Sequence, residues 1–219
     1  MDELYVDSVR KSFGFKHVLT DIFISCKPGD RIGLIGRNGS GKSTCLKIIA
    51  GSLKADNHFI RVNGQHITGL AESQGKISYL PQNNFLPTHL KVNRIIDLFC
   101  KTEIDTLKNN PHIKPFLKRK SKELSGGEQR MIEILLIIPA GAQYVLIDEP
   151  FNGVEPLYKV EIKKLIQEHS REKGFIVTDH DYKSILALTT KIILLHEGCV
   201  KEIKTEEDLI KWGYLPDCS

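Results

Sequence analysis

The sequence lacks the long apolar run that spanning a bilayer requires. Its longest apolar runs, Ile134 to Ile138 and Ile192 to Leu195, have the size of buried core segments. The first residues, Met1-Asp2-Glu3-Leu4, carry acids where a secretory signal peptide carries bases. We therefore expect a cytoplasmic chain that works at an inner or plasma membrane only through a partner.

The five cysteines include no Cys-x-x-Cys pair, and their number is odd. They are Cys26, Cys45, Cys100, Cys199 and Cys218. Disulfide frameworks and zinc sites are built from paired or closely spaced cysteines. The wide spacing argues against both, and we interpret these residues as reduced thiols that mostly fill buried positions.

Charge of one sign is not in excess either. The 219 residues include 31 lysines and arginines against 27 aspartates and glutamates, a net charge of +4. So small a surplus argues against a histone-like binder, and we expect no nucleic-acid partner. Because 41% of the residues are hydrophobic, the chain can bury a sizeable core, and we expect a single domain over residues 1–219.

Strand-like and helical patterns alternate along the chain, which predicts an α/β fold with a mostly parallel sheet. Strands are expected at 4–9, 18–26, 31–35, 59–62, 76–80, 144–147, 175–178, 191–195 and 199–203, and helices at 42–50, 126–138 and 157–169. The first two strands predict a small antiparallel β subdomain. The strands 59–62 and 76–80 are expected to flank the turn Asn63-Gly64, and approximately 83–138 to form an inserted helical subdomain.

A glycine-rich loop separates the apolar strand 31–35 from a helix. It matches the pattern G-x-x-x-x-G-K-[ST] in full and, with the next residue, comprises Gly36, Arg37, Asn38, Gly39, Ser40, Gly41, Lys42, Ser43 and Thr44. Glycines let backbone N–H groups turn toward a polyphosphate, and the helix start adds partial positive charge. We expect Lys42 to reach the β- and γ-phosphates and the Ser43 hydroxyl to bind Mg²⁺. The pattern predicts the core of a P-loop NTPase.

An acidic pair follows the apolar strand 144–147. Asp148 and Glu149 come at its carboxyl end, which is where ligands bind in open α/β sheets. We expect Asp148 to bind the metal, directly or through water, and Glu149 to polarise the attacking water. Beside a complete phosphate loop, this pair predicts hydrolysis of a nucleoside triphosphate.

Four further motifs share their order with one family. Residues 124–129, LSGGEQ, resemble the signature of ABC-type ATPases, the nucleotide-binding subunits of ABC transporters. RKSFG at 10–14 is similar to that family's adenine-stacking loop, YLPQ at 79–82 to its Q-loop and TDH at 178–180 to its switch-histidine loop. The resemblance covers nearly the whole chain, from Tyr5 to Val200.

The resemblance implies an ATPase that pairs head to tail with a second ABC ATPase subunit, identical or different, and drives transport through a separate membrane subunit. Each ATP then lies between one chain's phosphate loop and the other chain's signature. The residues expected to bind the partner's nucleotide are Ser125, Gly126, Gly127 and Glu128. A helix start that offers a hydroxyl, free N–H groups and its dipole suits an anion. The implied cofactors are ATP and Mg²⁺.

The resemblance also implies roles for three side chains outside the loop. Phe13 is expected to stack on the adenine, with Phe15 as the alternative. Gln82 is expected to contact the metal through water and to connect the site to the membrane partner. His180 is expected to hydrogen-bond the γ-phosphate and to join Glu149 in catalysis.

Residues 149–156 look most like the lipopolysaccharide-export and branched-chain amino-acid transporter subunits. In one respect they depart from the family, because Glu155 stands where its D-loop ends in aspartate; slow basal hydrolysis is therefore expected. One alternative is a soluble ABC-type ATPase that acts on a protein or metal-cluster assembly scaffold without a membrane partner. Another is a GTPase or small-molecule kinase, against which the missing Asn-Lys-x-Asp motif argues.

Overall fold

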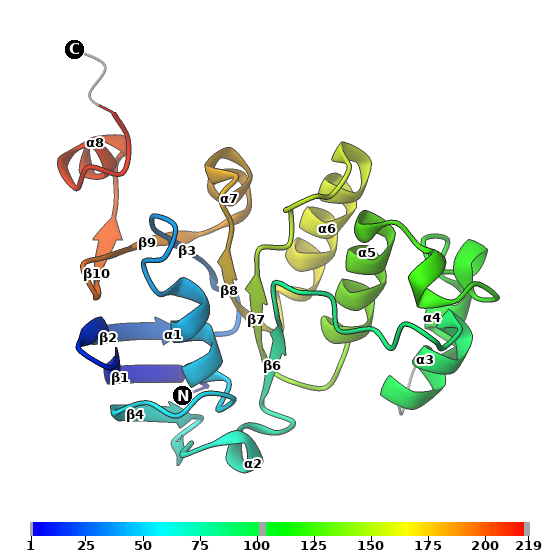
Figure 1. Cartoon of the computed structure of the whole chain (residues 1–219), viewed down its shortest axis with the longest axis horizontal. Coiled ribbons are helices and arrows are strands. Elements are labelled where there is room, and N and C mark those ends of the chain that lie inside the picture. The colour runs from blue at the N-terminus through cyan, green and yellow to red at the C-terminus, as the bar shows by residue number, and fades with distance from the viewer. Residues whose placement is uncertain (1, 101–103, 217–219) are drawn as a thin grey trace.

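The computed structural model describes residues 2–100 and 104–216. Within them, ten strands form one sheet in the order β5-β4-β1-β2-β10-β9-β3-β8-β7-β6 (Figure 1). The strands are β1 (Leu4–Phe13), β2 (Lys16–Cys26), β3 (Arg31–Ile35), β4 (Asn57–Val62), β5 (Gln65–His66), β6 (Ile77–Leu80), β7 (Tyr144–Asp148), β8 (Gly174–Thr178), β9 (Lys191–His196) and β10 (Cys199–Ile203). The helices are α1 (Lys42–Ile49), α2 (Leu70–Ser73), α3 (Val92–Phe99), α4 (Ile104–Asn109), α5 (Gly126–Ile137), α6 (Pro156–His169), α7 (Tyr182–Leu188) and α8 (Glu206–Lys211), with 3₁₀ turns η1 (Lys114–Phe116) and η2 (Ser121–Glu123).

The parallel part of the sheet carries the loops of the predicted site. β3 pairs in parallel with β8 and β9, and β7 pairs in parallel with β6 and β8. Every residue of β7 and β8 is buried. Strands buried on both faces are continuous apolar runs, which is why both could be recognised in the sequence. Because parallel strands end at the same edge, the loops after β3, β6, β7 and β8 meet there.

The antiparallel part consists of β1, β2, β4 and β5, and it confirms the predicted β subdomain. One predicted pairing was wrong. The turn Asn63-Gly64 joins β4 to the two-residue strand β5, whereas β6 pairs with β7. Both turn residues have positive φ, 52° and 81°, as a tight hairpin turn requires. Such a turn pairs only the strands directly beside it, and 76–80 follows α2 instead.

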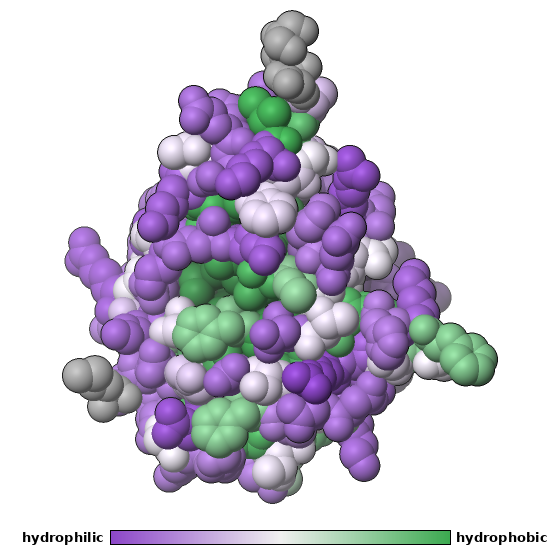
Figure 2. All heavy atoms as spheres, turned by 90° about the vertical axis from the view of Figure 1, so that its left-hand side faces the viewer, coloured by the Kyte–Doolittle hydropathy of each residue, from purple (hydrophilic) through white to green (hydrophobic). Residues whose placement is uncertain are grey.

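The outer face of the sheet bears an apolar hollow of about 330 Å³. Figure 2 shows apolar side chains gathered in a hollow on the side of the molecule that holds β1, β2 and β10. The lining residues come from β2, β3, β9 and β10, and they are Phe23, Ile24, Ser25, Ile32, Lys191, Ile193, Val200 and Glu202. None of them belongs to the predicted nucleotide site.

Helices without strands fill the chain between β6 and β7. α3, α4, η1, η2 and α5 lie together at the end of the molecule opposite the antiparallel strands (Figure 1). α3 buries Val92, Ile95 and Ile96, whose i, i+3, i+4 spacing gives one apolar face. The expected helical region is therefore helical, and α4 ends at Asn109, directly before Asn110-Pro111.

Two apolar clusters sandwich the parallel strands. On β7, Val145 and Ile147 belong to the cluster that includes α5, α6 and α7, whereas Tyr144 and Leu146 belong to the cluster that includes α1. Alternate residues of a strand point to opposite faces, so helices cover the sheet on both sides. This layered arrangement is the predicted α/β fold.

Cys26, Cys45 and Cys199 are free thiols. Cys26 and Cys45 are buried, and burial raises the pKa of each thiol to about 12. Cys100 and Cys199 are half-buried, so only two of these four match the expected buried positions. Cys218 lies outside the described residues.

Candidate active site

The phosphate loop turns sharply between β3 and α1. Gly36, Gly39 and Gly41 have positive φ values of 158°, 75° and 108°. A Cβ on Gly41 would come within 2.8 Å of the Val18 side chain, so only glycine fits there without a shift. α1 begins directly after Gly41, with no acid in its first turn and no side chain capping it. No carboxylate of the helix's own first turn therefore competes for its free N–H groups.

The Lys42 side chain is held over the phosphate loop by backbone carbonyls of that loop. Its Nζ donates to the carbonyl oxygens of Gly36 at 2.8 Å and Arg37 at 3.2 Å. Burial lowers the pKa of the Lys42 ammonium, while the carboxylates of Glu149 and Asp148 raise it. A buried cation that has backbone partners but no directly paired carboxylate suits an incoming anion.

A cavity of about 410 Å³, within the usual range for ligand pockets, adjoins this loop. It is lined by Phe13, Val18, Asn38, Gly39, Gly41, Lys42, Ser43, Thr44, Gln82, Glu149 and His180. The fold thus brings ten of the predicted residues to one cavity from five separate segments. Phe13 lines the cavity, whereas the fully exposed Phe15 does not, which favours the first of the two aromatic candidates. The residues present fit a nucleoside triphosphate.

The other predicted loop residues lie outside this lining. Gly36 packs against the Leu195 carbonyl, which a Cβ there would meet at 2.7 Å. The Ser40 hydroxyl oxygen is buried and has no hydrogen-bond partner among the described residues. The Arg37 guanidinium donates to the carbonyl of Gly213 at 2.8 Å, away from the cavity.

Glu149 is the buried acid of the cavity. Its side chain is 6% exposed, and its backbone has a φ of 54°, which non-glycine residues rarely adopt. The His180 Nε2 lies 2.7 Å from one carboxylate oxygen, and the Gln82 amide donates to the other at 2.7 Å. The Asn152 amide adds a contact of 3.2 Å. Three loops therefore fix this carboxylate, and a strained backbone aims it into the cavity.

Asp148 lies one residue earlier, at the end of β7 and behind Glu149. It is 1% exposed and accepts from the Thr178 hydroxyl at 2.6 Å and the Tyr79 hydroxyl at 3.2 Å. Burial, and then the Asp148 charge, raise the pKa of Tyr79. Tyr79 therefore stays a hydrogen-bond donor. No local sequence pattern assigned the hydroxyls of Tyr79 and Thr178 this role.

A buried ion pair that the sequence analysis missed connects α5 to the site. The Arg130 guanidinium lies 3.3 Å from the Glu133 carboxylate and also donates to the backbone carbonyls of Pro81, at 2.6 Å, and Asp148. Glu133 accepts from the Phe85 N–H at 2.7 Å, although burial raises the pKa of its carboxyl. The signal was present as two charges, three residues apart, inside an apolar helix pattern. This pair fastens α5 to the segment around Gln82.

The predicted signature residues form the start of α5 and do not line the cavity. Ser125 is the N-cap, and its hydroxyl accepts from the Glu128 N–H at 3.2 Å. The Glu128 carboxylate accepts from the Ser125 N–H at 2.7 Å, which completes a capping box. Ser125 and Gly126 are exposed, whereas Gly127 is buried. A single chain therefore leaves this helix start outside its own nucleotide cavity.

A model of the ABC transporter family matches residues 19–152 of the chain. The chain belongs to this family. It is 31% identical over 206 residues to a probable ABC transporter ATP-binding protein of Azorhizobium caulinodans, covering 88% of this chain and 73% of that protein. It is 29% identical over 214 residues to the lipopolysaccharide export system ATP-binding protein LptB of Escherichia coli K12, covering 90% and 88%.

Solved structures agree with these relatives. The structure of an ATP-binding subunit of an ABC transporter superimposes with a TM-score of 0.85 at 22% identity, over 98% of this chain and 95% of that one. A nucleotide-free ATP-binding cassette from an ABC transporter gives 0.81 at 25% identity, over 99% and 96%. This chain is an ATP-binding subunit of an ABC transporter, an ATPase whose hydrolysis is coupled to transport. In the described residues, no helix is both long and apolar enough to cross a bilayer.

Proposed function

We propose that this subunit works as half of a head-to-tail pair that encloses two MgATP between its chains. The observation that carries the proposal is the separation of two predicted ATP-binding parts within one chain. The cavity beside Lys42 is lined by Glu149 and His180, but not by Ser125. The exposed start of α5 is free to cover the nucleotide of a second chain. The second chain is either a copy of this one or another subunit of the family.

The triphosphate of ATP occupies the glycine-rich loop in this proposal. Backbone N–H groups at the start of α1 bind the phosphates, and Lys42 exchanges its backbone carbonyl partners for phosphate oxygens. Phe13 stacks on the adenine. The Ser43 hydroxyl, Gln82 and Asp148 hold Mg²⁺, with Asp148 acting directly or through water. The ion neutralises charge on the phosphates.

Glu149 accepts the proton of the attacking water. Its hydrogen-bond partners support this role, because Gln82 and His180 hold the two carboxylate oxygens on either side. His180 is 44% exposed at the cavity, so the same imidazole can also donate to the γ-phosphate. A positioned general base contributes about 10²- to 10⁴-fold to such a step.

The membrane-spanning partner lies outside this chain, which we place on the cytoplasmic face of the membrane. Exposed apolar side chains on the helical segment support a docking surface there, namely Leu98 and Phe99 at the end of α3. LptB, one of the relatives, is by name part of lipopolysaccharide export. Other relatives carry only the general transporter name, so the similarity does not select a substrate.

The test is light scattering of the Glu149→Gln variant. We expect it to bind ATP, to hydrolyse it about 10²- to 10⁴-fold more slowly, and to accumulate a dimer with MgATP. Two controls should remain largely monomeric. One is the wild-type protein with ADP, and the other is Glu172→Gln, a change at an exposed glutamate. A Glu149→Gln chain that stays monomeric at saturating MgATP would contradict a pair of identical chains and would favour a different ABC subunit as the partner.

A further inference from the structure

The chain bends back on itself after α8. Gly213, at a φ of 65°, donates its N–H to the Ile210 carbonyl at 2.8 Å, and the Tyr214 N–H donates to the Leu209 carbonyl at 2.8 Å. Such a left-handed glycine commonly ends a helix and reverses the chain. Leu209 is 1% exposed and belongs to the same apolar cluster as α5 to α7. The turn formed by Trp212, Gly213 and Tyr214, here called the C-terminal turn, is therefore anchored in the core.

One end of the C-terminal turn contacts the phosphate loop. The Arg37 guanidinium donates to the Gly213 carbonyl at 2.8 Å, across 176 positions of sequence. Arg37 and Ser40 also line a cavity of about 200 Å³ together with Trp212 and Tyr214. This cavity adjoins the phosphate loop but does not include Lys42, Ser43 or Thr44. The side chain of Arg37 thus contacts the C-terminal turn, on the side of the phosphate loop away from the proposed ATP cavity.

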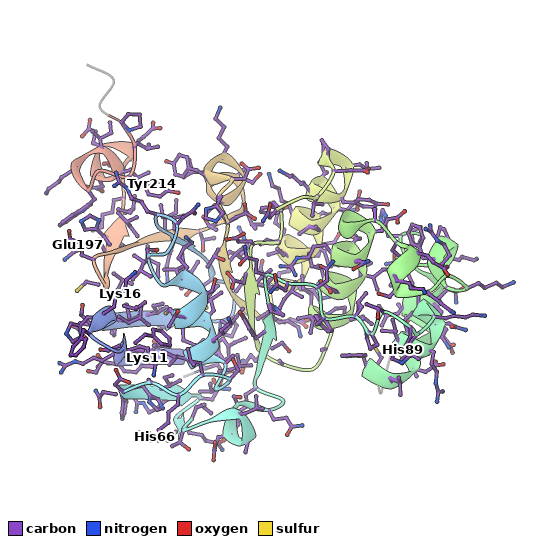
Figure 3. The ribbon with its side chains drawn as sticks, in the orientation of Figure 1. Lys11, Lys16, His66, His89, Glu197 and Tyr214 are labelled. Carbon is purple, nitrogen blue, oxygen red and sulfur yellow. The ribbon has the colours of Figure 1, made fainter. Side chains whose placement is uncertain are left out.

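The other end contacts the histidine loop. The Tyr214 ring packs against the Tyr182 ring, with centroids 6.0 Å apart and planes at 61°. Tyr182 follows His180 by two residues, and its N–H donates to the His180 carbonyl at 3.0 Å. Burial, and then the nearby Asp179, raise the pKa of Tyr214, which agrees with its place against this loop. Tyr214 lies below α8, at the end of the molecule that α7 and the loop before α1 share (Figure 3).

We propose that the C-terminal turn is a brace that couples the phosphate loop to the histidine loop, with Arg37 and Tyr214 as its positioning residues. The inference rests on the proposed function, in which these two loops hold the phosphates from opposite sides. Phosphate binding at one loop moves the Gly213 carbonyl through Arg37, and Tyr214 transmits the position to Tyr182 and His180. A misplacement of about 1 Å can cost on the order of 100-fold in rate, so a fixed spacing of the two loops matters.

The chain carries its own reporter for this coupling. Trp212 is the single tryptophan of the sequence, and it lies in the brace. The ammonium groups of Lys201 and Lys211 lie 5.1 Å and 5.8 Å from its ring centroid, and the His196 ring lies 5.8 Å away. Because charges near the indole affect its emission, movement of the turn against these groups changes the fluorescence.

The first experiment titrates the full chain with MgATP while Trp212 emission is recorded and binding is measured by calorimetry. In the wild-type protein the emission should change with the midpoint that calorimetry gives. In Arg37→Ala, ATP should still bind, but the amplitude of the emission change should fall by at least about threefold, because the loss of one hydrogen bond from a charged donor uncouples the turn. Arg171→Ala, a change at an exposed arginine after α6, should behave as wild type.

Steady-state kinetics separate positioning from simple loss of fold. Arg37→Ala should raise the KM for MgATP about three- to tenfold with little change in kcat. Tyr214→Ala should lower kcat about three- to tenfold, whereas Tyr214→Phe keeps the ring contact and should restore it. Tyr5→Ala, at another half-buried tyrosine packed edge-on against Phe23, is the control and should leave kcat unchanged. The double variant should show less than the product of the two effects, because both act through one turn.

Two results would overturn the brace. One is a wild-type amplitude of the Trp212 signal in Arg37→Ala; the other is an unchanged signal in the wild-type protein when calorimetry shows binding. Failure of the proposed function looks different, because Glu149→Gln would then stay monomeric at saturating MgATP. The two ideas can therefore fail separately.

Discussion

The starts of α1 and α5 are both glycine-rich helix ends, yet they treat their own N–H groups in different ways. At α1 the N-cap is Gly41, no side chain caps the helix, and the first turn holds no acid. At α5 the Ser125 hydroxyl and the Glu128 carboxylate satisfy each other's N–H groups. The α1 start is thus prepared for a phosphate by one chain alone. The α5 start is stable without a ligand and can remain exposed until a partner arrives.

The two helix starts also differ in the charge of the side chains beside them. The α1 start has a buried lysine beside it, whereas the α5 start has the carboxylate of Glu128 in its first turn. A carboxylate near a second anion is unfavourable unless cations are also present. The α5 start therefore suits a phosphate that another chain's lysine and metal already neutralise. The difference between the two ends predicts a division of labour: α1 binds ATP, and α5 completes the site.

The largest expected effect comes from Lys42→Ala. Among the described residues, Lys42 supplies the only ammonium that lines the cavity, so MgATP binding should become undetectable in this variant, a loss of more than about 100-fold. Calorimetry measures it, and Lys47→Ala, at an exposed lysine of the same helix, is the matched control. Unchanged affinity for MgATP in Lys42→Ala would contradict the claim that the start of α1 binds ATP.

A smaller effect is expected from Ser125→Ala. Loss of the cap should lower the free energy of unfolding by about 0.5–2 kcal/mol, and ATP binding by the single chain should stay unchanged. Hydrolysis should fall about tenfold, since the hydroxyl is lost from the partner's site. Ser125→Asp is the control, because aspartate caps equally well but brings a negative charge to the phosphates. Normal hydrolysis in Ser125→Asp would show that the α5 start does not face ATP.

The smallest effect is expected from Glu155→Asp. Glu155 is the exposed N-cap of α6, makes no capping bond, and its backbone lies beside Gly127 at the start of α5. Turnover should rise about two- to tenfold if the longer side chain misplaces a neighbouring loop, and the free energy of unfolding should rise by about 0.5–1 kcal/mol because aspartate caps the helix. Phosphate release and thermal unfolding measure the two effects. Equal or lower turnover would mean that the interface accommodates the glutamate.

Much of the fold and site could be predicted because local patterns encode it. The loop 36–44 needs glycines at fixed positions, and buried parallel strands are uninterrupted apolar runs, so both can be recognised without knowing any distant contact. Residues 77–80 were recognised as a strand but paired wrongly, since the parallel partner β7 lies far along the chain. The residues of a turn indicate pairing only between strands that are adjacent in the chain.

Most of the features that were not predicted are long-range contacts. The Tyr79 and Thr178 hydroxyls can donate hydrogen bonds to Asp148 only when β6, β7 and β8 lie side by side in the sheet. Arg130 reaches Pro81 only through the packing of α5. α8 is different, because its capping box of Thr205 and Asp208 was present in the sequence as a local signal and was overlooked.

The most direct test of the division of labour mixes two inactive chains. Lys42→Ala has a disabled α1 end, and Ser125→Arg has a blocked α5 end, so each should hydrolyse almost no ATP alone. A mixed pair contains one complete site, formed by the phosphate loop of the second chain and the signature of the first. If pairing is random, an equal mixture should regain about a quarter of the wild-type rate of phosphate release. No regained activity, with both variants folded and Ser125→Arg still binding ATP, would contradict a site shared between two copies of this chain.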